Sequence, residues 1–251
     1  MRAELPRVYL LDVEGTVAPV SFVYGQLFPY ARAHFEEFLQ WNVAHLQEDF
    51  LGNLDQLIVE NLSAQDPDAP MILPVFDVKT VSANPSAFVQ KVLAYIFWLM
   101  DRDRKSTALK SLQGKIWKAG FESGELKGAL FDDVPEALAR WNAQGKVAIY
   151  SSGSVEAQRL VFRHSIFGDL TGLISNYFDT RTGAKGESAS YSAIVAAMGV
   201  APEKVIFFSD VVRELDAARG AGCQTRLVVR EGNTPVEDAH GHAAVESFVL
   251  L

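Results

Sequence analysis

The sequence predicts an α/β fold in which a parallel sheet carries helices on both faces. Short apolar runs have the length and composition of buried strands, and the first is Val8 to Leu11. From Phe131 onward, strand-like and helix-like segments alternate, which is typical of parallel sheets with helical crossovers. The expected strands are 8–11, 147–150, 173–178, 205–208 and 226–229, with helices at about 155–167 and 191–198 and another ending near 218.

A mostly helical insertion separates the first expected strand from the others. Apolar residues recur at helical spacing in residues 24–60 and again from 85 to 130. Residues 63–86 hold four prolines and few periodic positions, so we expect a long connection there. The expected domains are a Rossmann-like α/β core made of residues 1–18 and 130–251, and a helical cap made of residues 19–129.

Composition argues against several classes of protein. A formal net charge of −8 opposes binding to nucleic acid. No apolar run approaches the roughly 20 residues of a membrane span, and acids interrupt the N-terminus before a signal-peptide core could develop. The single cysteine, Cys223, allows no internal disulfide and fits a reducing compartment. We therefore expect a cytoplasmic protein without nucleic-acid or membrane partners. It should be a monomer, because no heptad or long exposed apolar stripe calls for a partner chain.

The most informative motif is the end of the first expected strand, where the chain reads VYLLDVEGT. Residues at i and i+2 of an extended segment share a face, so Asp12 and Glu14 can converge on one point. Two adjacent carboxylates are costly unless they bind a hard cation or share a proton. The motif therefore indicates a Mg²⁺ site in which one carboxylate acts as a nucleophile. A turn bearing two solvated acids is the alternative.

Ligands of parallel sheets bind beyond the carboxyl ends of the strands, so the residues after the other strands are candidates as well. The second expected strand is followed by Ser151, Ser152 and Ser154, which lead into a helix. Hydroxyls and free backbone N–H groups at a helix N-terminus bind phosphate. We expect Ser154 to cap the helix, which leaves Ser151 and Ser152 for contact with phosphate.

Two further strand ends supply charged side chains. Lys185 lies between two glycines ahead of a helix, where it can offset the charge of a nucleophile and a phosphate; a solvated loop lysine is the alternative. Asp210 follows the fourth expected strand and can complete a shell of oxygen ligands around Mg²⁺. Glu214 can hold a metal-bound water or pair with a base, although an ion pair with Arg213 competes.

These strand ends, in this order, resemble those of the haloacid dehalogenase superfamily of phosphotransferases. The resemblance implies that Asp12 attacks phosphorus to form an aspartyl-phosphate, with Mg²⁺ bridging Asp12 and the phosphate. Glu14 replaces the commoner aspartate, and we assign it the same work of protonating the leaving alcohol and then activating water. The expected site comprises Asp12 and Glu14 as catalytic residues, Ser151, Ser152 and Lys185 as substrate-binding residues, and Asp12, Glu14 and Asp210 as metal ligands.

Longer runs, spread over nearly the whole chain, resemble the acireductone synthase family, the enolase–phosphatases of methionine salvage. They are DVEGTVAPVSFVYGQLFPYA, DRKSTALKSLQGKIWKAGF, YSSGSVEAQRLVF, YFDTRTGAKGESASY and FFSDVVRELDAA. The resemblance implies a Mg²⁺-dependent phosphoric monoester hydrolase whose substrate is a small phosphorylated diketone, 2,3-diketo-5-methylthiopentyl-1-phosphate. Its products would be acireductone and phosphate. Glu231, which replaces an expected proline, departs from the family without touching the chemistry.

Two chemical steps are implied. A base removes a proton from the phosphate-bearing carbon, which the adjacent ketone acidifies, and Asp12 then takes the phosphoryl group from the enol phosphate. No histidine lies within the recognised motifs, so we expect Glu14 to serve both steps. The helical insertion should act as a lid that excludes water and contacts the methylthio end of the substrate. Candidates for that contact, with core packing or solvation as the competing roles, are Arg104, Lys105, Lys110, Lys115, Trp117 and Phe121.

Three other functions fit parts of the pattern. A general sugar-phosphate phosphatase or phosphomutase fits the same strand ends, but Glu14 and the cap argue against it. A dehalogenase would give Asp210 no purpose as a Mg²⁺ ligand, so a requirement for Mg²⁺ separates the two. A catalytically silent phosphate-binding or scaffold protein would need no nucleophile, which Asp12 supplies.

Overall fold

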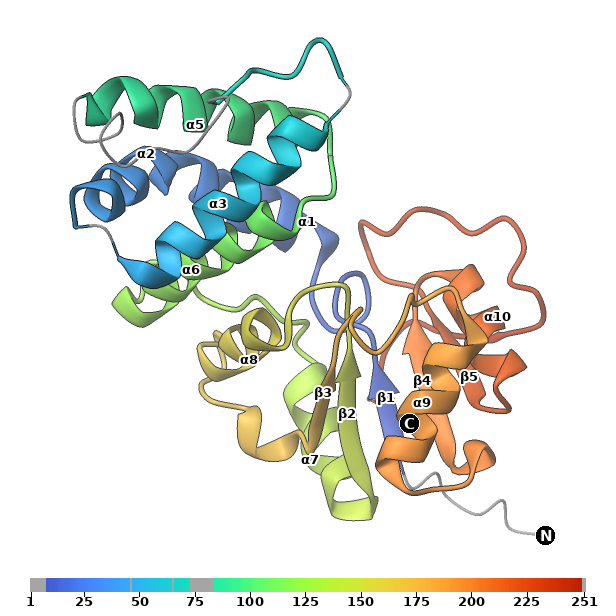
Figure 1. Ribbon diagram of the computed structural model, residues 1–251. Coiled ribbons are helices and arrows are strands. Elements are labelled where there is room, and N and C mark those ends of the chain that lie inside the picture. Colours follow the sequence, from blue (N-terminus) through green and yellow to red (C-terminus); the bar gives the residue numbers. More distant parts are fainter. Residues whose placement is uncertain (1–7, 46, 65, 73–83, 250–251) are drawn as a thin grey trace, which may run out of the picture. The chain divides into compact units, whose positions relative to one another are not determined.

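The computed structural model describes residues 8–45, 47–64, 66–72 and 84–249 (Figure 1). The chain forms two compact units, and we call them the core unit and the helical unit. The core unit combines Met1–Gln26 with Phe121–Leu251, and the helical unit is Leu27–Gly120. The chain therefore passes from one unit to the other between residues 26 and 27 and again between residues 120 and 121. The boundaries expected from the sequence lie between 18 and 19 and between 129 and 130. The displacement arises because both crossings lie inside helical segments that continue from one unit into the other.

The core unit contains a parallel sheet of six strands in the order β3-β2-β1-β4-β5-β6. Strand β1 is central, with Val8 opposite Lys146 of β2 on one side and Val205 of β4 on the other. This topology confirms the predicted α/β fold with a parallel sheet. The strands are β1 Val8–Leu11, β2 Lys146–Tyr150, β3 Asn176–Phe178, β4 Val205–Ser209, β5 Gln224–Val228 and β6 Ala243–Val245.

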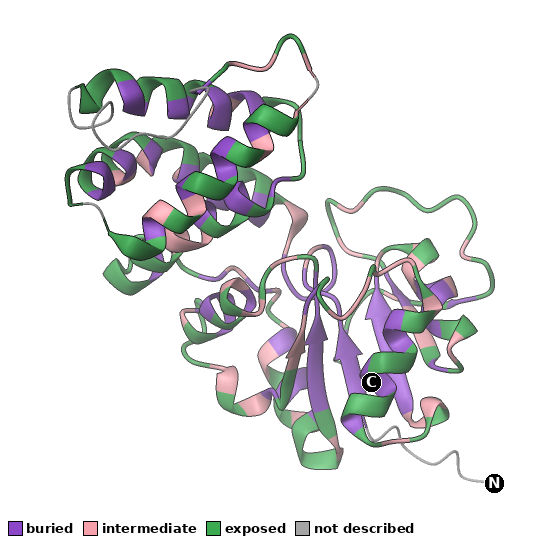
Figure 2. Cartoon of the chain, viewed as in Figure 1, coloured by how far each residue is buried: buried purple, intermediate pink, exposed green. Residues whose placement is uncertain are grey.

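Helices pack on both faces of this sheet. Val8 and Leu10 belong to a buried cluster with residues of α9 and α10. Alternate residues of a strand face opposite sides, and Tyr9 accordingly stacks on Trp141 of α7 at 5.0 Å between ring centroids. Figure 2 shows the resulting pattern, in which the central strands β1, β2 and β4 are largely buried and the helices are buried along one side. The helices of the core unit are α1 Val20–Phe22, α7 Val134–Gln144, α8 Val155–Arg163, α9 Ser188–Met198 and α10 Val212–Gly220.

Some elements differ from the expected ones. The strand expected from residue 173 begins at Asn176, because Thr171–Leu173 forms a 3₁₀ turn, η2, whose Thr171 N donates to Asp169 Oδ1 at 2.9 Å. Helix α7 and the short edge strand β6 were not predicted. A second 3₁₀ turn, η3 Pro202–Lys204, precedes β4.

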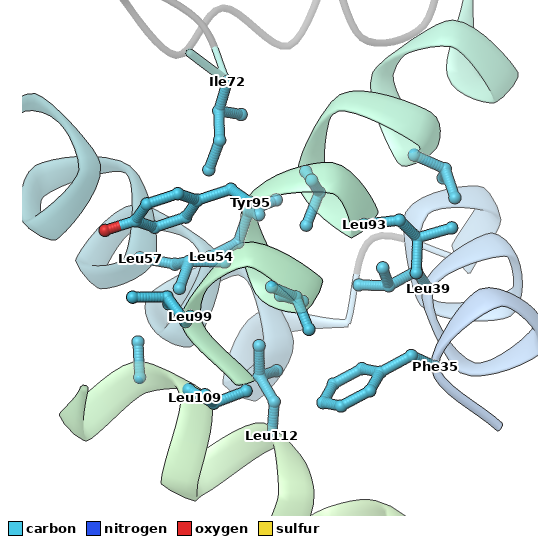
Figure 3. Close-up of a cluster of buried hydrophobic side chains, with 14 of the residues drawn as sticks. Phe35, Leu39, Leu54, Leu57, Ile72, Leu93, Tyr95, Leu99, Leu109 and Leu112 are labelled. Carbon is cyan, nitrogen blue, oxygen red and sulfur yellow. The ribbon is translucent and has the colours of Figure 1, made fainter. Parts of the chain in front are cut away.

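The helical unit is built around one apolar cluster, shown in Figure 3. Residues Phe35, Leu54 and Leu112 come from three different helices and are almost completely buried. The chain expected to be helical over residues 24–60 is divided between two helices that end at 45 and begin at 48. Of the expected connection at 63–86, residues 65 and 73–83 lie outside the described residues. The helices are α2 Phe28–His45, α3 Glu48–Ser63, α5 Pro85–Asp101 and α6 Thr107–Ser123, the last of which continues into the core unit.

The first crossing between the units has an unusual backbone. Helices α1 and α2 are joined by one π-helical turn, η1 Val23–Leu27, and the 26/27 boundary lies within it. Such turns insert an extra residue into a helix and are frequent at functional sites. Across the described ranges, no helix combines the length and the apolar character needed to span a membrane.

Candidate active site

Asp12 lies directly after β1, in a tight loop of the core unit. Its amide donates to Phe208 O at 2.9 Å, which extends the pairing of β1 with β4 by one residue. The chain then turns back, because the amides of Val17 and Ala18 both donate to Val13 O at 2.9 Å. Asp12 is 4% exposed, so its carboxylate depends on protein partners more than on water.

Gly15 allows this loop to approach the end of β4. Its φ of +70° is a conformation that residues with a side chain rarely adopt. A Cβ at this position would lie 2.2 Å from Asp210 Oδ2, far inside contact distance. The absence of a side chain therefore lets the Asp210 carboxyl group lie against the loop that carries Asp12 and Glu14.

Lys185 is buried between two carboxylates. Its Nζ lies 2.6 Å from Asp12 Oδ1 and 2.7 Å from Glu214 Oε2. Burial alone would lower the pKa of Lys185, but the charges of Asp12 and Glu214 outweigh it and raise that pKa. Lys185 is therefore a permanent cation next to the predicted nucleophile.

Two buried tyrosines fix the loop that carries Lys185. Tyr150 Oη donates to Gly183 O at 2.9 Å, and Tyr191 Oη donates to Lys185 O at 2.8 Å. Burial raises the pKa of both phenols, so both keep the proton that these bonds need. The position of the lysine is thus set by side chains from β2 and α9.

These groups line a pocket of about 260 Å³ in the core unit. This volume lies near the lower end of the range for small-molecule sites and suits a phosphate group with a few carbon atoms. Carboxylates, one ammonium and the hydroxyls of a serine and a threonine form its polar part, and two valines and a tyrosine add apolar surface. The lining residues are Asp12, Glu14, Val20, Tyr24, Ser152, Lys185, Asp210, Val211, Glu214, Gly232 and Thr234.

The pocket carries an excess of negative charge. Asp12, Glu14, Asp210 and Glu214 supply four carboxylates against the one ammonium of Lys185, which leaves a net charge of −3 when all are ionised. Burial, followed by the charge of Asp12, raises the pKa of Asp210 to about 7. The same two causes raise the pKa of Glu214, against the attraction of Lys185. A bound cation would relieve this repulsion.

The donor set also suits a divalent cation. Hard cations prefer carboxylate oxygens, which Asp12, Glu14 and Asp210 provide around one pocket. Burial first, and then the charge of Asp12, raises the pKa of Asp210, and a bound cation would oppose both effects. In the described part of the chain, no three His, Cys, Asp or Glu side chains already form a complete ion-binding cluster. Asp12 and Glu214 instead converge on Lys185. The residues thus fit Mg²⁺ in chemistry and charge, and the ligand set itself stays a prediction.

The three serines after β2 have different surroundings. Ser154 Oγ accepts from Ala157 N at 3.2 Å and caps α8, as expected. Ser152 is exposed and lines the pocket. Ser151 is buried, and its Oγ accepts from Gly153 N at 3.1 Å. Ser152 is therefore the better placed of the two predicted phosphate contacts.

The other candidates are distributed more widely. Arg104 forms an ion pair at 2.7 Å within the helical unit, and Trp117 Nε1 donates to Leu27 O at 2.8 Å. Phe121 belongs to the core unit, where it is buried and stacks on His164. No histidine is among the residues that line the pocket. Glu214, for which an ion pair with Arg213 was the competing expectation, pairs with Lys185 at 2.7 Å.

Sequence reasoning missed two side chains that hold the loop after β1. Asn233 Nδ2 donates to Gly15 O at 2.9 Å, and Arg230 Nε donates to Thr16 O at 3.3 Å. Both residues follow β5. The rule that pointed to the ends of the other four expected strands applies to this strand too, and it would have found them.

Comparison with known proteins agrees with this geometry. The family model for haloacid dehalogenase-like hydrolases matches residues 6–222. An enolase-phosphatase E1 of Synechococcus elongatus is 50% identical over 231 residues, which cover 91% of this chain and 90% of that protein. A protein of Populus trichocarpa named probable bifunctional methylthioribulose-1-phosphate dehydratase/enolase-phosphatase E1 is 42% identical over 98% of this chain, which spans 47% of that longer protein. The crystal structure of the UTR4 protein of Saccharomyces cerevisiae superposes with a TM-score of 0.72 at 34% identity, covering 98% of this chain and all of that one.

The sheet topology and the matched segment define the class: the chain belongs to the haloacid dehalogenase-like hydrolases. Within that class, similarity that extends through both units makes it a member of the enolase-phosphatase E1 family.

Proposed function

We propose that the chain is a Mg²⁺-dependent enolase–phosphatase that converts 2,3-diketo-5-methylthiopentyl-1-phosphate to acireductone and phosphate in methionine salvage. The observation that carries this proposal is identity of 50% over 91% of the chain with an enolase-phosphatase E1. A phosphatase of another specificity would be expected to share the core unit and differ in the helical unit, because insertions of this kind select the substrate.

The composition of the Populus relative supports the choice of substrate. Its name joins a methylthioribulose-1-phosphate dehydratase to an enolase-phosphatase E1 in one chain. Loss of water from methylthioribulose 1-phosphate leaves a methylthio diketone that still carries the phosphate. That compound has the acidic proton and the phosphate ester that the two proposed steps consume.

The first proposed step is enolisation. Glu14 removes a proton from the phosphate-bearing carbon and keeps it, and the electron pair moves to the oxygen of the neighbouring ketone to give the enolate form of the enol phosphate. Mg²⁺, held by Asp12, Glu14 and Asp210, would supply positive charge for the developing enolate and for the phosphate. Glu14 lines the same pocket as the proposed phosphate contacts Ser152 and Lys185, which supports its reach to that carbon.

The second proposed step is phosphoryl transfer. A carboxylate oxygen of Asp12 attacks phosphorus, the bond from phosphorus to the enol oxygen breaks, and Glu14 returns a proton to that oxygen. Water activated by Glu14 then hydrolyses the aspartyl-phosphate and releases Asp12 and phosphate. Lys185, 2.6 Å from Asp12 Oδ1, offsets the negative charge that the nucleophile and the phosphate bring together.

The remaining parts of the proposal concern the setting of the reaction. The helical unit would act as a lid that excludes water and contacts the methylthio end, with Ser151 as a second phosphate contact beside Ser152. The enzyme would work as a cytoplasmic monomer. The net charge of −8 supports the absence of nucleic-acid partners.

The test is turnover of the diketo phosphate, followed by acireductone absorbance and released phosphate in one sample. Both signals should rise together with Mg²⁺ and disappear with EDTA or in Asp12→Asn. Phosphate release from several unrelated esters, with none from the diketone, would replace this function by that of a general sugar-phosphate phosphatase.

A further inference from the structure

We propose that Arg230 and Asn233 are positioning residues that hold the loop carrying Asp12 and Glu14 in its reactive conformation. They donate to two successive carbonyls of this loop, Thr16 O and Gly15 O. The inference deepens the proposed function and rests on Asp12 and Glu14 being the catalytic carboxylates. Neither Arg230 nor Asn233 has a chemical part in the reaction.

The carbonyl groups of Gly15 and Thr16 need hydrogen-bond donors from elsewhere in the chain, because the backbone hydrogen bonds within the loop use other carbonyl groups as acceptors. The amides of Val17 and Ala18 donate to Val13 O, and the amide of Gly15 donates to Ala18 O at 2.8 Å. The carbonyls of Gly15 and Thr16 receive side-chain donors from the segment after β5 instead. Buried carbonyls that lose such donors are costly, so the loop would move to regain partners.

Arg230 is rigid enough to act as such a partner. Its Nη1 and Nη2 donate to the two carboxylate oxygens of Asp133 at 2.8 and 3.0 Å, and the side chains are 7% and 10% exposed. The guanidinium also lies 4.5 Å from the ring centroids of Phe131 and Phe248. A planar cation held in this way, by a two-point pair and between aromatic rings, has few alternative orientations.

Asn233 links the same loop to the metal-binding side of the pocket. Its Oδ1 is buried without a hydrogen-bond partner among the described residues. This oxygen and Asp210 Oδ2 would lie 3.0 and 2.2 Å from a Cβ at Gly15, so both are on the same side of that glycine. The Asn233 amide thus holds Gly15 O with its nitrogen and presents an unused acceptor beside Asp210. A water bound to a cation at Asp210 is a donor of the kind this acceptor lacks.

The decisive variant is Asn233→Ala, because Arg230→Met would leave Asp133 buried and unpaired and could prevent folding. Two quantities are measured: the dissociation constant of Mg²⁺ by titration calorimetry without substrate, and kcat and KM for the diketo phosphate at saturating Mg²⁺. We expect Mg²⁺ affinity and kcat each to fall about 10- to 100-fold, with KM within about twofold. Losses of this size are typical when a residue that orients the metal ligands without touching the metal is replaced. Asn233→Asp, which keeps an oxygen but loses the donor to Gly15 O, should not restore kcat.

Arg230→Lys is the second variant. Lysine keeps the positive charge beside Asp133, so the protein should stay folded. It cannot donate to both carboxylate oxygens of Asp133 and to Thr16 O at once, so kcat should fall. The matched control is Arg140→Met. Arg140 donates to Phe248 O and therefore tethers the same C-terminal segment, whereas Arg230 also donates to Thr16 O of the loop.

The proposal is overturned if Asn233→Ala keeps Mg²⁺ affinity and kcat within about twofold of the parent, or if Arg140→Met loses as much as Arg230→Lys. Failure of the proposed function has a different outcome. If the parent does not convert the diketone but hydrolyses p-nitrophenyl phosphate, the same variants are compared on that ester and by calorimetry. A loss of Mg²⁺ affinity there would uphold the positioning role alone.

Discussion

The two compact units bury different kinds of side chain. In the helical unit the buried cluster is apolar, and the buried polar residues among those that the structure describes are amides and a hydroxyl: Asn42, Asn61, Ser106 and Gln113. Asn61 shows how they are used, since it donates to Pro70 O at 2.9 Å and accepts from Ile72 N at 3.0 Å. Polar burial there completes the backbone bonding of a connection.

In the core unit, charges are buried against one another. Asp12, Lys185 and Glu214 form a chain of ion pairs, and Asp210 adds a further carboxyl group. Such groups lose more hydration than their attraction returns unless every partner is present. Packing in the helical unit therefore provides stability, whereas the core unit keeps charged groups together at a cost in stability because its chemistry requires them. Substitutions in the two units should therefore change different measured quantities.

The largest expected effect is that of Asp12→Asn on turnover. Replacement removes the nucleophile, so kcat should fall about 10⁴-fold or more. The free energy of unfolding of the metal-free protein should stay the same or increase, because Lys185 keeps Glu214 as its partner and one of the four carboxylates that repel one another loses its charge. Urea denaturation in EDTA measures this, and a large loss of stability would show that Asp12 supports the fold as well as the reaction.

The second expected effect concerns packing. Leu112→Ala removes a side chain that is 0% exposed in the helical cluster, and it should lower the free energy of unfolding by about 2–5 kcal/mol. Below the unfolding transition kcat should remain within about twofold, since no pocket residue changes. Leu62→Ala is the matched control, because Leu62 is 50% exposed in the same unit and should change stability by less than about 0.5 kcal/mol. A tenfold loss of kcat in folded Leu112→Ala would contradict the separation of the two units.

The sequence predicts the grouping of charges in the core unit only in part. Asp12, Lys185 and Asp210 were predicted to lie together because each follows a strand, and the order of parallel strands brings such positions to one edge. Lys185 was predicted to offset the charge of the nucleophile, and it does pair with Asp12. Its second pair, with Glu214, was not predicted, since it depends on how Tyr150 and Tyr191 hold the loop before α9.

The edge strand β6 and the ion pair of Arg230 with Asp133 could not be predicted from local sequence patterns. The edge strand β6 has three residues, Ala243–Val245, which is too short a segment for an alternating pattern to show. The buried pair of Arg230 with Asp133 joins residues 97 positions apart. Nothing in the sequence around either residue distinguishes it from a charged side chain in solvent. Only the tertiary fold brings the two together.

The raised pKa of Asp210 should make the free energy of unfolding of the metal-free protein depend on pH. The pKa of Asp210 is raised to about 7, whereas an unfolded aspartic acid titrates near 4. Between these values the folded state keeps a proton that the unfolded state has lost, so stability of the metal-free protein should decrease as pH rises from about 4 to 7. The expected change is about 1–2 kcal/mol after allowance for solvent screening.

Urea denaturation at several pH values, in EDTA and then in saturating Mg²⁺, measures this slope. Mg²⁺ should remove it, because the cation takes the place of the proton, and Asp210→Asn should remove it without metal. A slope that persists unchanged in Asp210→Asn would assign the effect to another group.

The smallest expected effects separate the serines at the start of α8. Ser154 caps the helix through Ala157 N, so Ser154→Ala should lower the free energy of unfolding by about 0.5–1 kcal/mol and leave KM unchanged. Ser152 is exposed and lines the pocket, so Ser152→Ala should raise KM severalfold with stability unchanged. The two serines differ by two positions, have the same side chain and precede the same helix. If KM rose in Ser154→Ala and not in Ser152→Ala, the phosphate would be bound by the helix end itself, and the proposed position of the substrate in the pocket would be wrong.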